Sequence, residues 1–149
     1  MSRNKLEDLK QEHNLKSKEL AEMLSISESK YSEWEKDKVP IPTKRLIQLA
    51  NYYKVNIDYI LNLTKNKKYY NTKKEINLET IGNRLYQIRN EQKLSLRELE
   101  KRINCSFSSI AAYERGERLI VSYALINLAK LGNYSIDWIL DRSNNKYIK

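Results

Sequence analysis

The feature that constrains this chain most is an internal repeat. When the 149-residue sequence is shifted by 79 positions, residues 4–61 align with residues 83–140 without a gap. Identical residues recur along the whole alignment, and polar and apolar positions keep their order across five segments. Similar composition alone does not preserve such an order. The chain is therefore predicted to contain two copies of one small folded unit.

Each copy shows the pattern of five short helices. In the second copy, Asn77 is placed to cap a helix over residues 78–91, where Ile81, Leu85 and Ile88 recur at helical spacing. Four more helices are expected to begin after or at serines, namely Ser95 (in a capping-box pattern with Glu98), Ser106, Ser122 and Ser135. The first copy repeats this pattern, and the whole chain has only 3 Gly and 2 Pro, which disfavours turn-rich β architectures. The predicted fold class is all-α, with two tandem five-helix domains.

The repeat and the composition predict the domain organisation. The first domain is expected over residues 1–63 and the second over residues 78–142. Between them lies a Lys-rich linker, residues 64–77, and a polar tail follows at residues 143–149. Apolar periodicity is weak in the linker, which is why it is interpreted as a connection between domains.

The charge balance points to a polyanionic partner. Lys and Arg total 28 against 19 Asp and Glu, a formal net charge of +9. Residues 1–63 contribute only +1, whereas the linker and residues 78–149 contribute +4 each. The positive field is therefore predicted to belong to the linker and the second copy.

Several classes of protein are disfavoured by the same composition. No apolar run is long enough to cross a bilayer, and the charged first ten residues contain no apolar signal core, so a cytoplasmic protein without membrane contact is expected. One Cys and one His provide neither a disulfide framework nor a zinc site. No nucleophile is paired with a base, and no Gly-rich phosphate loop is present, so neither an enzyme nor a cofactor is expected.

The two copies resemble the Cro/C1-type (Xre-like) helix-turn-helix family. The second copy carries the resemblance in Arg89 and in the runs "LSLRELE", "YERGER" and "SIDWIL". The first copy carries it in "LKSKELAEMLSIS", "WEKDK", "IPTKRLIQLA" and "NIDYIL". In this family a charged residue after the third helix pairs with one at the end of the first helix, which implies the pairs Glu114–Arg89 and Glu35–Lys10. We expect Tyr31, Trp34, Ile110 and Tyr113 in the cores, with Cys105 as a small buried apolar residue.

The resemblance also implies a DNA-binding surface. The third helix of each copy would enter the major groove of double-stranded DNA, while residues at the start of the second helix and after the third would hold phosphates. The base-facing positions implied are Glu28, Ser29 and Glu33 in the first copy and Phe107, Ser108 and Ala112 in the second. The phosphate-facing positions are Ser17, Lys18, Lys36, Lys38 and Lys44 in the first copy and Ser95, Arg97, Arg115, Arg118 and Ser122 in the second.

The base-facing positions depart from the usual pattern of this family. Arg, Lys, Asn and Gln are the strong readers of base edges, and neither third helix presents one of them at these positions. The leading interpretation is a sequence-specific DNA-binding transcriptional regulator of bacterial or phage type, with repression as the favoured mode. Its two copies act as an intramolecular pseudo-dimer, or the chain forms a homodimer through the fifth helices. The alternative is a protein-interaction module, such as a phage or mobile-element inhibitor or anti-repressor, in which the first copy binds a protein partner through its acidic face at Glu28 and Glu33.

Overall fold

The computed structural model describes residues 4–71 and 74–148. The chain divides into two compact units at Tyr69 and Tyr70, and each is considered by itself. The parts of the expected first domain, linker and tail that fall on residues 1–3, 72–73 and 149 lie outside the described residues. No helix in the described part is long and apolar enough to cross a membrane.

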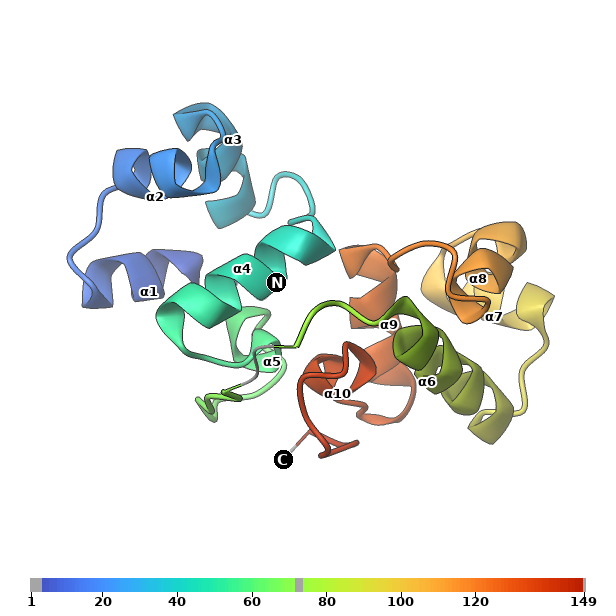
Figure 1. The fold of residues 1–149 in the computed structure, drawn as a ribbon. Coiled ribbons are helices and arrows are strands. Elements are labelled where there is room, and N and C mark those ends of the chain that lie inside the picture. Colours follow the sequence, from blue (N-terminus) through green and yellow to red (C-terminus); the bar gives the residue numbers. More distant parts are fainter. Residues whose placement is uncertain (1–3, 72–73, 149) are drawn as a thin grey trace. The chain divides into compact units, whose positions relative to one another are not determined.

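In its described residues, 4–69, the first unit consists of five helices and their connections (Figure 1). They are α1 (Leu6–Glu12), α2 (Ser17–Leu24), α3 (Glu28–Glu35), α4 (Thr43–Tyr53) and α5 (Ile57–Ile60). α2 packs against α3, and α4 packs against α5. The Ser27 hydroxyl accepts a hydrogen bond from the Lys30 amide at 3.1 Å, which caps α3.

The second unit repeats this arrangement. Its helices are α6 (Leu78–Glu91), α7 (Leu96–Ile103), α8 (Phe107–Glu114), α9 (Ser122–Gly132) and α10 (Ile136–Ile139). The bounds of α7 to α10 equal those of α2 to α5 shifted by 79 residues, and α6 ends where α1 ends. Serine side chains cap α7, α8 and α10, as the sequence predicts, whereas α9 begins after Val121 without a side-chain cap. The all-α fold with two tandem helix-turn-helix domains is confirmed.

Backbone conformation follows the repeat as closely as the helices do. Every described residue with a positive φ has a partner 79 residues away that also has a positive φ. The pairs are Asn14 and Lys93, Ser25 and Asn104, Asp37 and Gly116, Lys54 and Asn133, and Asn62 and Asp141. These positions end helices, where a left-handed residue satisfies carbonyl groups that the helix leaves unpaired. Both copies therefore turn the chain at the same points, although only one of the ten residues is Gly.

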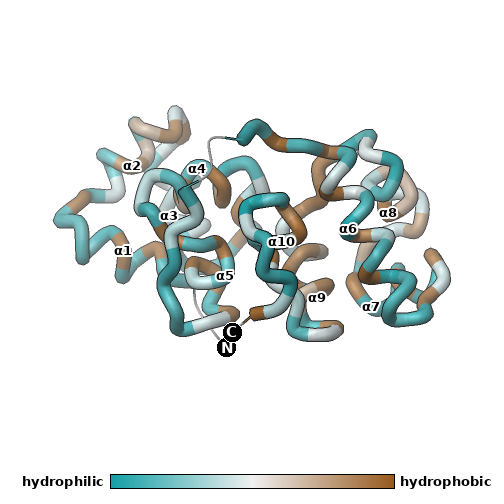
Figure 2. Tube along the Cα trace, turned by 60° about the horizontal axis from the view of Figure 1, so that its bottom comes forward, coloured by the Kyte–Doolittle hydropathy of each residue, from teal (hydrophilic) through white to brown (hydrophobic). Residues whose placement is uncertain are grey.

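The core of each unit is built from the apolar stripes of its helices. Figure 2 shows apolar and polar segments alternating along α1 and α6, as expected for helices with one buried face. The predicted core residues Tyr31, Trp34, Ile110 and Tyr113 are buried, and so is Cys105. Burial raises the pKa of the Cys105 thiol, so it stays protonated and unreactive at neutral pH.

The repeat continues past the fifth helix of each unit. Asn66 donates its amide N–H to the Thr64 hydroxyl, and Asn145 donates its amide N–H to the Ser143 hydroxyl. Residues 64–68 and 143–148 are called the first and second strap from here on. In the second strap, the Ser135 amide bonds the Lys146 carbonyl at 2.9 Å. The segment expected as a polar tail is thus hydrogen-bonded to its own unit.

Each strap is fastened by a lysine at an equivalent position. Lys67 lies 2.8 Å from a carboxylate oxygen of Glu12, and its ammonium group lies 5.4 Å from the centre of the Tyr59 ring. Lys146 lies 2.6 Å from a carboxylate oxygen of Glu91 and 5.5 Å from the centre of the Trp138 ring. Lys67 thus joins the end of α1 to α5, and Lys146 joins the end of α6 to α10. Tyr59 and Trp138 consequently pack within their own units.

The first two turns of α6 make a close contact within the second unit. Gly82 lies in these turns and faces the end of α8. A Cβ atom at this position would lie 2.5 Å from the Tyr113 carbonyl oxygen and 2.6 Å from that of Glu114. Both neighbours are backbone atoms, so only a residue without a side chain permits this approach.

We predict that Gly82→Ala destabilises the second unit. The added methyl group forces α6 away from α8, and overpacking of this kind costs about 1–3 kcal/mol of unfolding free energy. Urea unfolding followed by circular dichroism measures the loss. Asn83→Ala, at an exposed position one residue further along α6, is the matched control and should change stability by less than about 0.5 kcal/mol. An unchanged midpoint for Gly82→Ala would contradict the close approach of the two helices.

Candidate nucleic-acid interface

Each unit contains a helix-turn-helix with the same local geometry. In the second unit, Asn104 follows the end of α7 and turns the chain with a φ of 55°. Ser106 then caps α8, because its hydroxyl accepts a hydrogen bond from the Ser109 amide at 3.2 Å. In the first unit, Ser25 and Ser27 take these positions. A three-residue connection between α7 and α8, or α2 and α3, therefore sets the direction of the second helix of each motif.

A largely buried ion pair fixes α8 to α6. Arg89 contacts Glu114 through two hydrogen bonds, Nε to Oε2 at 2.7 Å and Nη2 to Oε1 at 3.0 Å. A third bond runs from Nη1 to the Leu94 carbonyl at 3.1 Å. The hydrogen bonds with Glu114 raise the pKa of Arg89 above its usual value. Because a bidentate pair fixes orientation as well as distance, it holds the end of α8 at a set angle to α6. The predicted pair Glu114–Arg89 is confirmed.

The first unit uses a different version of this pair. The Lys10 ammonium lies 2.9 Å from Glu35 Oε1 and 3.1 Å from the Ser17 hydroxyl, so the predicted pair Glu35–Lys10 is also confirmed. Lysine makes one contact with the carboxylate where arginine makes two. Tyr31 and Tyr53 lie beside Glu35 at positions that align with Ile110 and Gly132. Burial, followed by the charges of Tyr53 and Glu35, raises the pKa of Tyr31, so this phenol stays protonated at neutral pH.

The structure places four of the six base-facing candidates on exposed helix starts. Glu28 and Ser29 begin α3, and Phe107 and Ser108 begin α8. Glu33, further along α3, is half-exposed. The expectation for Ala112 is wrong, because its side chain is buried, with only 6% exposed. The Glu117 amide bonds the Ala112 carbonyl at 3.0 Å, so the loop after α8 folds back beside this residue.

Most phosphate-facing candidates are exposed as well. This group comprises Lys18, Lys36, Lys38, Lys44, Ser95, Arg97, Arg115 and Arg118. Ser17 is half-buried and accepts the bond from Lys10. Ser122 differs from this expectation, because the residue is buried, with only 5% exposed. The neighbouring Tyr123 is 40% exposed and aligns with Lys44, so the repeat itself indicated the better candidate.

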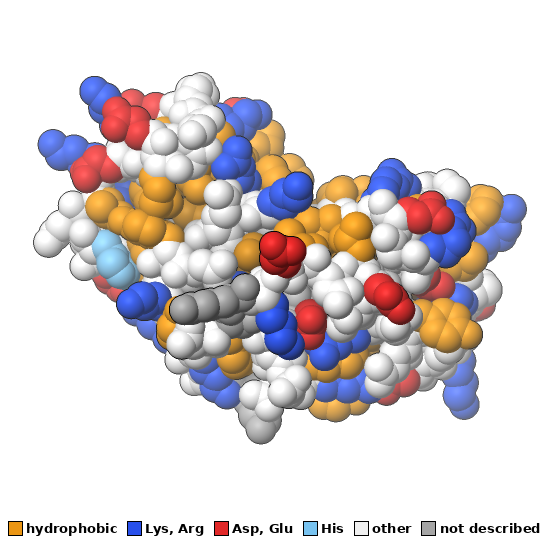
Figure 3. Space-filling model, in the orientation of Figure 1, with side chains coloured by type: hydrophobic (Ala, Val, Ile, Leu, Met, Phe, Trp, Pro, Cys, Tyr) orange, Lys and Arg blue, Asp and Glu red, His pale blue; other side chains and the backbone are white. Residues whose placement is uncertain are grey.

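The arginines of the second unit are engaged by neighbouring side chains. Arg115 forms an exposed ion pair with Glu117, which lowers the pKa of that carboxylate. Arg118 donates to the Ser109 hydroxyl at 3.1 Å, and its guanidinium lies 5.5 Å from the centre of the Tyr113 ring. These contacts hold both arginines beside α8. On the face drawn in Figure 3, basic and acidic side chains are interspersed and do not form one patch of a single sign.

The fifth helices do not offer the interface expected for a homodimer. Ile57 and Ile60 on α5 and Ile136 and Ile139 on α10 are fully buried. Each fifth helix is a single turn whose apolar side chains fill the core. No exposed surface of these isoleucines remains for a second copy of the chain.

We predict that breaking the two ion pairs has unequal effects. Glu114→Gln leaves the Arg89 guanidinium largely buried without its charge partner, a change that costs about 3 kcal/mol. Glu35→Gln should cost less, because Lys10 keeps the Ser17 hydroxyl and has a single contact to lose. The measurement is the free energy of unfolding of both variants in urea. Equal losses, or a larger loss for Glu35→Gln, would contradict the distinction between the two pairs.

Comparison with known proteins agrees with this geometry. A family described as "Helix-turn-helix domain" matches residues 4–65, and one described as "Helix-turn-helix" matches residues 85–139. The chain is 38% identical over 60 residues to a protein of Bacillus subtilis (strain 168) named "Uncharacterized HTH-type transcriptional regulator YobD". The match covers 40% of this chain and 54% of that protein, so the chain spans about half the length of this relative.

A likeness to a solved structure covers one part of the chain. The crystal structure of the clp gene regulator ClgR from Corynebacterium glutamicum is 24% identical, with a TM-score of 0.40. The alignment covers 46% of this chain and 72% of that one. The two family matches together take in both repeats, including α2 with α3 and α7 with α8. This chain therefore carries two helix-turn-helix domains in tandem, as its resemblance to the Cro/C1-type proteins implies.

Proposed function

We propose that the chain is a sequence-specific DNA-binding transcriptional regulator that binds double-stranded DNA and acts as a repressor in the cytoplasm. The observation that carries this proposal is the exposed start of α8, which has exposed guanidinium groups of Arg97, Arg115 and Arg118 on the elements around it. An exposed helix start can approach base edges in the major groove, while nearby cations contact the phosphates on either side.

The second unit is proposed to supply more of the DNA affinity than the first. α8 exposes Phe107 and Ser108, which carry no charge, whereas α3 exposes Glu28 at the equivalent position. A carboxylate near phosphates is repelled, and each such repulsion costs about 1 kcal/mol in water at a separation of roughly 4 Å. The distribution of charge also favours DNA binding by the second unit, because all of the net charge of +9 except +1 lies in residues 64–149.

The first strap makes the connection between the domains shorter than the linker of residues 64–77 that the sequence predicts. Residues 64–68 are fastened to the first unit, which leaves residues 69–77 as the connection to α6. Nine residues reach about 30 Å when fully extended. We propose that the two units bind neighbouring sites on one DNA molecule as an intramolecular pair, with a homodimer of the whole chain as the alternative assembly.

A second candidate function rests on the surface of α3. Glu28 is exposed there, and the Glu33 carboxylate lies 3.7 Å from the ammonium group of Lys30, the one basic residue of α3. An acidic helix of this kind suits a basic protein surface better than a nucleic acid. The first unit would then bind a protein partner while the second unit binds DNA.

The proposed function is tested by titrating the full chain against labelled duplexes and following fluorescence anisotropy at two salt concentrations. The duplexes are the DNA upstream of its own gene and a scrambled version of equal length. We expect tighter, salt-dependent binding to the upstream DNA. Equally weak binding to both duplexes, together with no enrichment of any sequence from a randomised duplex pool, would contradict the proposal.

Two variants of one ion pair should change DNA binding in opposite directions. Arg115→Ala removes a phosphate contact, so it should weaken binding and lower the slope of log affinity against log salt by about 0.9. Glu117→Gln removes the carboxylate that occupies Arg115, so it should strengthen binding by about two- to fivefold, given roughly 1 kcal/mol for a nearby charge.

Lys36→Ala in the first unit is the matched control for Arg115→Ala, because the two residues align in the repeat. It should change both affinity and slope less. A larger effect of Lys36→Ala would show that the first unit carries more of the DNA contact. Weaker binding by Glu117→Gln would contradict the proposal that this carboxylate competes with DNA for Arg115.

A further inference from the structure

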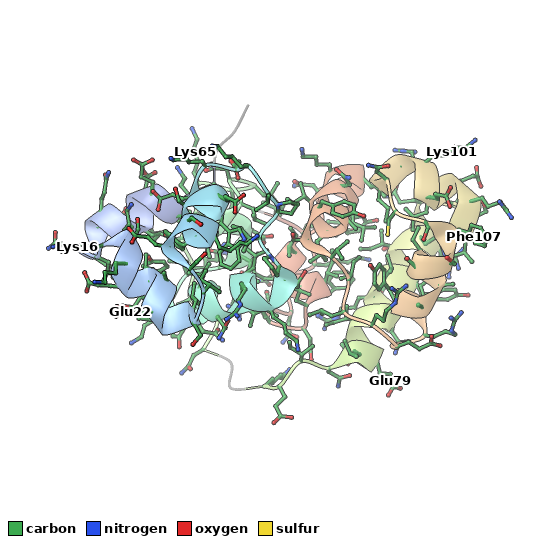
Figure 4. All side chains as sticks on the ribbon, turned by 90° about the horizontal axis from the view of Figure 1, so that it is seen from above. Lys16, Glu22, Lys65, Glu79, Lys101 and Phe107 are labelled. Carbon is green, nitrogen blue, oxygen red and sulfur yellow. The ribbon has the colours of Figure 1, made fainter. Side chains whose placement is uncertain are left out.

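The start of α8 contains a side-chain pair that has no counterpart in the first unit. Phe107 is the first residue of α8, and 38% of it is exposed (Figure 4). The guanidinium carbon of Arg97, on α7, lies 4.3 Å from the centre of the Phe107 ring. A cation at this distance from a ring face is attracted by the π electrons, so the ring holds the long arginine side chain in place.

The backbone at this point is fixed to the same helix that carries the arginine. The Phe107 amide donates a hydrogen bond to Glu100 Oε1 at 2.6 Å, and Glu100 is on α7. Arg97, Glu100 and Phe107 therefore form one cluster across the helix-turn-helix. The aligned residues of the first unit are Lys18, Ala21 and Glu28, which cannot form a stacked pair of this kind.

The Glu100 carboxylate also affects which groups can bind at the start of α8. A helix start attracts phosphates through its free amides, but here a carboxylate occupies the first amide. A phosphate in that place would meet a negative charge at short range. The surroundings of the pair therefore favour the uncharged edges of bases over the DNA backbone.

We propose that Arg97 and Phe107 together read guanine and thymine on two adjacent base pairs, with Arg97 on the guanine edge and Phe107 on the thymine methyl group. This inference rests on the proposed DNA-binding function and assigns Arg97 to a base. Arginine recognises the O6 and N7 atoms of guanine through two hydrogen bonds, and an aromatic ring contacts the methyl group of thymine. The separation of 4.3 Å between guanidinium and ring is close to the rise of about 3.4 Å between stacked base pairs.

The pair also provides the strong base reader that α8 does not carry on its own exposed face. Arg97 belongs to α7, so it would reach the groove beside α8 from the preceding helix. Phe107 acts both as its support and as the reader of the neighbouring base. The specificity of the second unit would then depend on two residues from two helices.

The test begins with selection of bound sequences from a randomised duplex pool by the full-length chain. We compare the unmodified protein with Arg97→Ala, Arg97→Lys, Phe107→Ala and, as the matched control, Lys18→Ala. The unmodified chain should enrich a guanine next to a thymine. Changing that guanine should weaken its binding by about 5- to 160-fold, the range for a bidentate contact to a base.

The variants separate base recognition from charge. Arg97→Ala and Arg97→Lys should both lose the guanine preference, although Arg97→Lys keeps the positive charge. Deoxyuridine in place of the thymine, which removes only the methyl group, should weaken binding by the unmodified chain but not by Phe107→Ala. Lys18→Ala removes a phosphate-facing candidate of the first unit, so it should leave both base preferences unchanged even where it lowers the overall affinity.

Two other outcomes would overturn the inference in distinguishable ways. If Arg97→Ala weakens binding to all duplexes equally, lowers the salt slope by about 0.9 and keeps the guanine preference, Arg97 contacts a phosphate and the proposed function stands. If no sequence is enriched and binding to every duplex is equally weak, the proposed function and the inference both fail. Circular dichroism of each variant establishes that the fold is retained.

Discussion

The position of each candidate recognition helix depends on one ion pair between the first and third helices of its unit. α8 is a helix of only eight residues, too short to be stable or oriented by itself, and Arg89 with Glu114 ties its end to α6. The pair is hydrogen-bonded on both carboxylate oxygens, so it fixes direction as well as proximity. What α8 can present at its start follows from this constraint, because the opposite end of the helix is anchored.

The two units keep the same backbone and differ in the side chains that matter for binding. Most helix bounds, the residues with positive φ and the lysines that fasten the straps recur at a spacing of 79 residues. By contrast, the second unit has Phe107 where the first has Glu28, and Arg97 where the first has Lys18. The duplicated fold thus provides two helix-turn-helix units whose exposed side chains differ. In the first unit α3 begins with the acidic residue Glu28, and in the second unit Arg97 stacks on the ring of Phe107. Such a difference allows one chain to divide DNA readout and other contacts between its halves.

Much of the fold could be predicted from the sequence because the signals are local. Capping residues such as Ser95 and Ser106 and the apolar spacing of α6 define helix starts and faces, and the repeat confirms each prediction in a second copy. The burial of Ala112 and Ser122 could not be predicted in this way, because it depends on how the loop after α8 folds back. The sequence analysis does not predict that the straps bind to their units, although Asn66 and Lys67 align with Asn145 and Lys146 at the spacing of 79 residues. The stacking of Arg97 on Phe107 depends on the angle between α7 and α8, which sequence spacing alone does not give.

The central claim is that the second helix-turn-helix carries most of the DNA contact. Hydrogen exchange of the full chain, followed by mass spectrometry with and without a duplex selected from the randomised pool, tests this claim most directly. The account predicts that DNA slows exchange chiefly in residues 95–123, at the start of α8, in α7 and in the loop that leads to α9. Slower exchange confined to residues 17–44 would contradict it, because the first unit would then be the main DNA-binding surface.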